Sequence, residues 1–216
     1  MPITSYSELK TAIEEWLAQD DVSARTDDLI GLAEATFNRR LSLRQMQNVM
    51  TGTLTTNTIT IPNDWLEMIR FTMDSGVPVQ EMTYQDPSSF FGAAHQTVSG
   101  FPRYYTIVGS TIYVGPTPDS GTGYTYTIQY LERLEVLSDS NTSNFLLEIA
   151  PDLYLFGALL QAESYLHNDE RIPLWQTMVN NAIHELQGQD MRSRYRPGAR
   201  QLPGGSGAIE SNFRRF

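Results

Sequence analysis

Residue types that can do chemistry are present in this chain of 216 residues, but they do not converge on one place. The three histidines, His95, His167 and His184, fall in one predicted loop and two predicted helices. None has a second histidine four residues away, which is the spacing of a helical zinc site. We therefore interpret them as partly exposed histidines with ordinary hydrogen-bond partners, and we expect no metal.

The other candidates for catalysis have non-catalytic explanations. Adjacent carboxylates occur at Glu14-Glu15, Asp20-Asp21 and Asp27-Asp28. Neighbouring residues on a helix do not share a face, so these pairs are predicted to be caps and surface rather than acid–base dyads. The run Gly204-Gly205-Ser206-Gly207 follows no strand and is interpreted as a linker. There is no nucleophile elbow, no phosphate-binding loop and no cysteine, so we expect no enzyme and no cofactor.

The least ordinary chemistry lies at the C-terminus. Six arginines occur there without a lysine, a composition that favours bidentate pairing with carboxylates or phosphates. Three aromatic residues offer anchors, while the prolines and glycines between them cannot propagate a helix. Two interpretations stay open: a solvated terminus, or a segment that folds when it binds a partner. The candidate binding residues are Arg192, Arg194, Tyr195, Arg196, Arg200, Phe213, Arg214, Arg215 and Phe216.

Charge divides the chain into two parts. The formal net charge is −10, but residues 188–216 carry +4 and residues 1–187 carry −14. An acidic body repels nucleic acid at long range. A basic segment on such a body indicates an acidic partner, or docking onto another copy of the chain.

Helical periodicity occurs at both ends of the chain. Ser5 and Glu8 form a capping box, and a second helix begins near Thr26. A third helix contains Pro151 in its first turn and is apolar nearly all round, which predicts the central helix of a bundle. Asp169 is expected to cap a fourth helix and Gly188 to end it. The expected stripes are Tyr6, Leu9, Ile13, Trp16 and Leu17, then Leu29, Ile30, Ala33, Phe37 and Leu41, then Leu174, Trp175, Met178, Val179, Ala182, Ile183 and Leu186.

Between these ends the pattern changes to that of strands. Residues 53–61 predict a hairpin or strand pair, and further strands are expected at 66–73 and 77–84. Asp86 and Pro87 predict the start of a short helix. Residues 103–114 predict a hairpin that turns at Gly109-Ser110, and residues 124–130 alternate as a half-buried strand does.

A cluster of tyrosines and a cluster of arginines could each bind a ligand, but both have simpler explanations. Six tyrosines in the strand region could stack on sugars or bases; packing of the sheet or of a subunit interface is the favoured interpretation. Arg39, Arg40 and Arg44 are too few to hold nucleic acid on an acidic body, and we expect salt bridges within the bundle or between subunits. The tyrosines are Tyr104, Tyr105, Tyr113, Tyr124, Tyr126 and Tyr130.

The predicted fold class is α+β, a helical bundle built from both chain ends with a β-rich insertion and an extended C-terminal arm. The expected parts are residues 1–48 and 138–190 for the bundle, 49–137 for the insertion and 191–216 for the basic arm. No basic leader precedes an apolar run at the N-terminus, and residues 145–160 are interrupted by polar residues and glycine, so neither a signal peptide nor a membrane span is expected.

Three stretches resemble the head-to-tail adaptor (connector) proteins of tailed bacteriophages, particularly of short-tailed ones. Residues 32–41, in the second predicted helix, are similar to the family's entry helix that leads into the insertion. Residues 100–119 are similar to its Gly-x-Pro-x-x-Tyr, hairpin and Pro-x-Pro run, which is the most specific match. Residues 151–175, with Pro151-Asp152-Leu153-Tyr154 and Trp175, are similar to its long helical pair.

The resemblance implies a structural role. Such a protein would form a ring of twelve copies beneath the portal protein, bridge it to a tail nozzle or tube protein, and continue the channel through which genomic DNA passes without specific binding. The arm would reach the portal, and the protein would reside in the virion after assembly in the host cytoplasm. The acidic body agrees, because phosphate binding requires cations. The alternative is a tail-associated carbohydrate- or receptor-binding module that uses the tyrosine-rich sheet.

Overall fold

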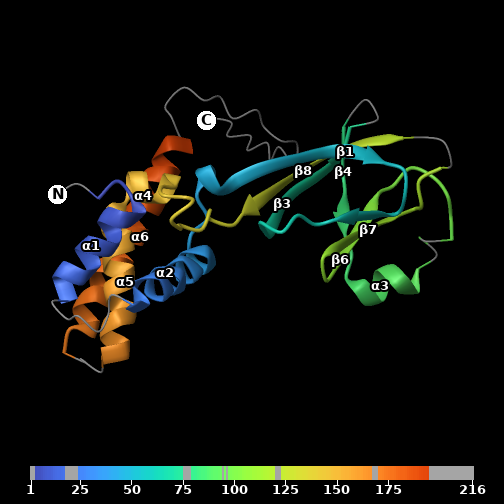
Figure 1. The fold of residues 1–216 in the computed structure, drawn as a ribbon. Helices are drawn as coiled ribbons and strands as arrows, with labels where there is room; N and C mark the ends of the chain where they lie inside the picture. The colour runs from blue at the N-terminus through green and yellow to red at the C-terminus, as the bar shows by residue number, and fades with distance from the viewer. Residues whose placement is uncertain are drawn as a thin grey trace, which may run out of the picture.

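The helices from the two chain ends gather at one end of the molecule, and two β-sheets lie with one short helix at the other (Figure 1). The expected α+β architecture, with a bundle from both chain ends around a β-rich insertion, is thereby confirmed. The structure is a computed structural model that describes residues 3–17, 24–74, 79–93, 95, 97–119, 123–166 and 170–194.

The bundle is built around one central helix, as predicted. Helix α5 packs against α1, α2, α4 and α6, and its residues Leu153, Tyr154, Ala158 and Leu159 are buried. The predicted apolar stripes of α1 and α2 turn inward, with the exception of Trp16, which is 51% exposed. The helices are α1 (Tyr6–Leu17), α2 (Thr26–Arg40), α4 (Phe145–Ile149), α5 (Pro151–Leu166) and α6 (Ile172–Arg194).

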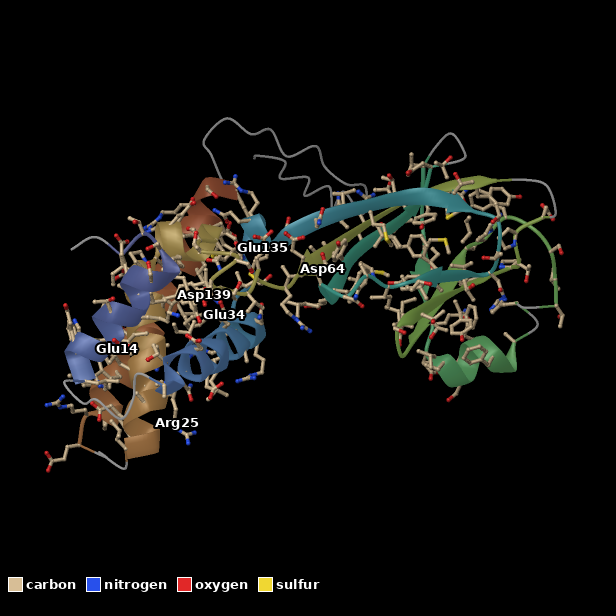
Figure 2. All side chains as sticks on the ribbon, viewed as in Figure 1. Glu14, Arg25, Glu34, Asp64, Glu135 and Asp139 are labelled. Carbon is tan, nitrogen blue, oxygen red and sulfur yellow. The ribbon has the colours of Figure 1, made fainter. Side chains whose placement is uncertain are left out.

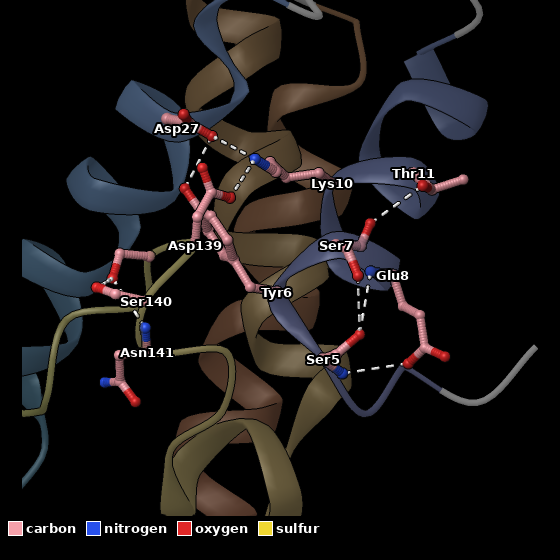
Figure 3. Close-up of polar contacts among 11 residues, drawn as sticks. Ser5, Tyr6, Ser7, Glu8, Lys10, Thr11, Asp27, Asp139, Ser140 and Asn141 are labelled. Atoms are coloured by element: carbon pink, nitrogen blue, oxygen red, sulfur yellow. Dashed lines mark hydrogen bonds and ion pairs between the residues drawn. The ribbon is translucent and has the colours of Figure 1, made fainter.

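Polar contacts fix the start of α1 against the rest of the bundle (Figure 3). The predicted capping box is present, because the Ser5 amide donates to Glu8 Oε2 at 3.1 Å and the Glu8 amide donates to Ser5 Oγ at 3.4 Å. Tyr6 Oη donates to Asp27 Oδ1 at 2.8 Å, and Lys10 bridges Asp27 and Asp139 at 3.3 and 3.2 Å. Helix α1 is thus held both to α2 and to the loop before α4.

The insertion holds two four-stranded sheets that share one core. Their strand orders are β1-β8-β3-β4 and β2-β7-β6-β5. Apolar side chains from both sheets, such as Phe71, Ile112 and Ile128, fill the space between them. The elements are β1 (Gln47–Leu54), β2 (Thr58–Thr60), β3 (Trp65–Met73), β4 (Gln80–Glu81), β5 (Thr83–Tyr84), α3 (Pro87–Gly92), β6 (Tyr104–Val108), β7 (Thr111–Gly115) and β8 (Tyr124–Glu132).

Local signals predicted several of these elements. Asp86 caps α3 by accepting from the amides of Ser88 and Ser89, both at 3.0 Å. Strands β6 and β7 form the predicted hairpin, with Gly109 at φ +60° in the turn, a conformation that glycine adopts without strain. The alternation of β8 is also confirmed, because Tyr124, Tyr126, Ile128 and Tyr130 face the core.

The predicted pairing within residues 53–61 is wrong. Strand β1 pairs with β8, and β2 pairs with β7, so the two strands belong to different sheets. The turn at Asn57 therefore passes the chain from one sheet to the other instead of closing a hairpin. The pattern shows that both segments are strands but not which partners they choose, because partner choice depends on packing between segments far apart in the sequence.

The predicted end of the fourth helix is also wrong. Helix α6 continues through Gly188 to Arg194. A glycine inside a helix costs only about 1 kcal/mol relative to alanine, and contacts beyond it offset this cost: Arg194 pairs with Asp190 at 2.7 Å, and Ser193 Oγ donates to the Asp190 carbonyl at 2.8 Å. Asp169, the predicted cap, lies outside the described residues.

Candidate assembly interface

The base of the basic arm is fixed to the bundle by one carboxylate. Asp190 Oδ2 accepts from Arg194 Nη2 at 2.7 Å, while its Oδ1 accepts from the backbone amide of Arg44 at 3.2 Å. Arg44 opens the short 3-10 turn that leads into β1. Gln187 Nε2 adds a bond to the Arg40 carbonyl at 3.1 Å. The last turns of α6 are therefore tied to the point where α2 ends and the first sheet begins.

Two of the nine candidate binding residues belong to this base. Arg192 and Arg194 are exposed on the last turn of α6. The other seven lie outside the described residues: Tyr195, Arg196, Arg200, Phe213, Arg214, Arg215 and Phe216.

A groove of about 210 Å³ lies beside this base. It runs between the last turns of α6 and the segment before β1, with Asp190 at its polar side. Ile149 and Met191, which are 48% and 62% exposed, leave apolar surface nearby. Its lining residues are Leu43, Arg44, Gln45, Ile149, Leu186, Gln189, Asp190 and Ser193.

A second polar cluster joins the sheets to the bundle. Glu34 is only 3% exposed, and its Oε1 accepts from the amide of Leu137 at 2.9 Å and from Tyr154 Oη at 3.2 Å. Asn144 Nδ2 donates to Tyr154 Oη at 2.7 Å and also to the carbonyl of Glu135. Figure 2 shows Glu34 and Glu135 near the junction of the two lobes.

This junction holds the chain that leaves β8 against α2 and α5. Asn38 accepts from the Leu134 amide at 2.9 Å, one helical turn beyond the contact that Glu34 makes. Burial raises the pKa of Glu34, and the two hydrogen bonds that it accepts only partly oppose this. Burial also raises the pKa of Tyr154 strongly, with Glu34 adding to the effect. The junction therefore sets the orientation of the sheets relative to the bundle.

Sequence reasoning missed the junction residues. Glu34 sits between Ala33 and Ala35, yet it continues the spacing of four that starts at Ile30 on the inward face of α2. A carboxylate at a buried helical position needs hydrogen-bond donors, and this requirement was the available signal. The donors come from the Leu137 backbone and from Tyr154 on α5, both more than a hundred residues away, which no local pattern identifies.

The arginines of α2 do not form the salt bridges expected within the bundle. Arg40 Nη2 donates to Asn180 Oδ1 at 2.7 Å, and Arg39 Nη2 donates to Thr36 Oγ1 at 3.1 Å. Arg44 contributes its backbone amide to Asp190. Among the described residues, none of the three guanidinium groups forms a salt bridge with a carboxylate. Pairing between subunits stays a prediction.

The tyrosine cluster packs the sheets, as the favoured interpretation predicts. Tyr124, Tyr126 and Tyr130 are buried, and Tyr130 stacks on Trp65 with ring centroids 4.7 Å apart. Tyr105 contacts Phe71 at 5.3 Å between centroids. Half of the cluster is therefore inaccessible to a stacked sugar or base in this structure.

Neither metal clusters nor membrane spans are found in the part of the chain that the structure describes. No group of three or more histidine, aspartate or glutamate side chains is arranged there to hold a metal ion. His95 shares a hydrogen bond with Gln85 at 3.1 Å and lies against Tyr104, whereas His184 is exposed on α6. His167 lies outside the described residues. No helix among them is both long and apolar enough to span a bilayer.

Comparison with known proteins identifies the family to which this architecture belongs. The comparison with curated proteins finds no match. The family model of the SU10 adaptor protein matches residues 4–201, which include both sets of bundle helices, both sheets and the first residues of the arm. This agrees with the resemblance found in residues 32–41, 100–119 and 151–175 and implies a structural, non-enzymatic role in the phage virion. The chain therefore belongs to the SU10 adaptor protein family, the phage head-to-tail adaptors.

Proposed function

We propose that twelve copies of this chain form a ring between the portal protein and the tail nozzle or tube protein, and that the ring continues the DNA channel. The bundle and the arm face the portal in this arrangement, and the sheets face the tail. The observation that carries the proposal is the two-lobed architecture, in which bundle and sheets lie at opposite ends. The sequence after α6 is rich in arginine. Each lobe can then serve a different neighbour.

The rigid junction supports this assignment. An adaptor must hold its two binding ends at a constant angle, and the contacts of Glu34, Asn38 and Asn144 fix the chain between β8 and α4. These contacts combine buried hydrogen bonds with the buried apolar side chains of Leu134 and Leu137.

The distribution of charge along the chain supports both the proposed DNA channel and the proposed role of the arm. Residues 1–187 carry a formal charge of −14, and an acidic surface lets DNA pass without binding its phosphates. The arginines of residues 192–215 suit carboxylates on the portal, because the planar guanidinium binds a carboxylate through two parallel hydrogen bonds. The base at Asp190 keeps the start of the arm in place while its remainder reaches the partner.

The test is docking onto purified portal rings, observed by electron microscopy. The full chain should add a ring of density, and a chain ending at Arg194 should not, although α6 and the Asp190–Arg194 pair are kept. A matched control replaces the arginines beyond residue 194 with lysine, which keeps the charge and removes the bidentate geometry. Weakened docking of this variant is expected. Normal docking by the truncated chain would refute the role of the arm.

A further inference from the structure

Strand β1 leaves a long backbone edge open. Among the strands that the structure describes, it lies at the end of its sheet and pairs only with β8, over eight residues from Gln47 to Leu54. None of these eight residues is charged. An uncovered edge of this length offers unpaired amides and carbonyls to another strand.

The hydrogen-bond pattern identifies the groups that point outward. The Asp74 amide donates to the Thr125 carbonyl, so the backbone of Thr125 faces β3 and turns away from β1. Thr125 stands opposite Thr53, which therefore directs its own amide and carbonyl outward, as does Thr51 two residues before it. The Val49 amide bonds to the side chain of Asn48, at 2.7 Å, which confirms that it does not point at β8.

The other sheet edges in the described part of the chain are protected. Strands β2, β4 and β5 have only three, two and two residues. The rest of β3 has register shifts between Trp65 and Glu67 and between Met68 and Arg70, and it carries charge on Glu67 and Arg70. Short strands, bulges and charges are the means by which proteins block unwanted strand pairing. Strand β1 has none of them, which indicates that a partner covers it.

The C-terminal arm begins beside this edge. Asp190, in the last turn of α6, bonds to Arg44, three residues before β1, and 22 residues follow Arg194. The longest stretch of the arm without proline or glycine is residues 208–216. In an extended strand its apolar Ile209 and Phe213 share one face, with the small Ser211 between them, and its polar Glu210 and Asn212 share the other. That alternation is typical of a half-buried strand. The intervening 13 residues, 195–207, can span up to about 43 Å, whereas β1 is about 27 Å long.

Charge decides the direction of pairing. Glu132, at the Gln47 end of the sheet, accepts from Asn48 Nδ2 at 2.6 Å. It lines a recess of about 290 Å³ with Asp64 and Glu135, and these three acidic residues share the lining with one basic residue, Arg133. Asp64 Oδ1 is buried without a partner among the described residues. This end of the sheet therefore favours cations.

We propose that residues 208–213 of the chain's own arm add a fifth strand to this sheet, antiparallel to β1 on its open edge. The register sets Glu210 opposite Thr51, so that Ile209 and Phe213 lie on the same face as Met50. Arg214 and Arg215 then follow at the Gln47 end, with Arg215 on the face of Asn48 and Glu132. In the free chain the arm thereby covers the edge, and docking onto a portal draws the arm away from it. The pairing itself needs no portal.

Engineered cysteines test the pairing directly, because the chain has none of its own. The variant Thr51→Cys/Glu210→Cys should form a disulfide within one chain under mild oxidation, since opposed residues of paired strands lie within bonding range. The matched control is Thr58→Cys/Glu210→Cys, whose first cysteine lies on the exposed, short strand β2. Non-reducing electrophoresis and mass spectrometry of the free protein give the yields. Equal yields in both variants, or disulfides only between two chains, would overturn the proposal.

Amide hydrogen exchange supplies a second test without substitutions. The amides of Thr51 and Thr53 should exchange at least about tenfold more slowly in the full chain than in a chain ending at residue 207. The Thr127 amide, inside the same sheet, should be equally protected in both. Rapid exchange of Thr51 and Thr53 in the full chain would contradict the pairing, whatever the outcome of portal docking.

Discussion

Glu34 provides the sharpest test of the junction between bundle and sheets. Its Oε1 is the acceptor for two groups from separate elements, the Leu137 amide and the Tyr154 hydroxyl. Glu34→Ala removes that acceptor and leaves both donors without a partner in a region where Glu34 and Tyr154 are nearly inaccessible to water. Glu34→Gln retains an oxygen in the same place and removes the charge.

The magnitude follows from the number of stranded donors. An unsatisfied buried donor costs about 1–3 kcal/mol, and relief from burying a carboxylate offsets part of this. We expect Glu34→Ala to lower the free energy of unfolding by about 2–4 kcal/mol and Glu34→Gln to change it by less than about 1 kcal/mol. Urea unfolding followed by tryptophan fluorescence is suitable, because Trp16 and Trp175 lie in the bundle and Trp65 in the sheets.

The stability that Glu34 contributes should also depend on pH, and the raised pKa of Glu34 fixes the direction of that change. Burial raises the pKa of Glu34 above its ordinary value of 4.5. The folded state therefore binds the proton more readily than the unfolded state, so the contribution of Glu34 is complete below pH 4.5 and is lost as pH rises through the folded pKa. The wild-type chain should gain stability relative to Glu34→Gln as pH falls from 7 towards 4.5. A constant difference, or equal losses in the alanine and glutamine variants, would refute this account of the junction.

Four further substitutions test particular positions. Gly157→Ala should lower the free energy of unfolding by about 1–3 kcal/mol, because its new methyl group would lie 2.6 Å from Phe37 Cζ. Gly188→Ala, the same change in open space on α6, is the control and should raise the free energy of unfolding by about 1 kcal/mol. Melting temperatures of the two variants should shift in opposite directions. Asp27→Asn should destabilise the bundle at pH 7 and lose its effect in acid. The hydrogen bond from Tyr6, and then the one from Lys10, lowers the pKa of Asp27, so the stability that Asp27 contributes disappears as pH falls through its folded pKa. Chemical unfolding at pH 7 and at pH 3 measures the difference. Asp86→Ala should lower the melting temperature by removing the cap of α3, and an unchanged melting temperature would contradict the capping role.

Local physics explains which elements could be predicted from the sequence. The start of α1, the cap of α3 and the β6–β7 turn each depend on a few neighbouring residues, namely Ser5 and Glu8, Asp86, and Gly109. The inward stripes of α1 and α2 follow from helical spacing alone, apart from Trp16, which reaches Phe156 and Trp175 from the rim and stays half exposed.

Non-local contacts explain what could not be predicted. The pairing of β1 with β8 joins residues 70 to 84 positions apart, so no local feature contradicted the expected hairpin at residues 53–61. The continuation of α6 beyond Gly188 depends on Asp190, whose partner Arg44 lies on the other side of the insertion. The junction at Glu34 likewise needs donors that only the folded chain brings together. The assigned role of the arm remains a prediction.

The central claim is that copies of this chain form a ring on the portal. Native mass spectrometry or cryo-electron microscopy of the chain bound to purified portal particles measures this directly. The proposal predicts twelve copies per portal ring, with the bundles against the portal and the sheets pointing away. A folded chain that does not bind the portal, or binds it with the sheets inward, would contradict the proposal.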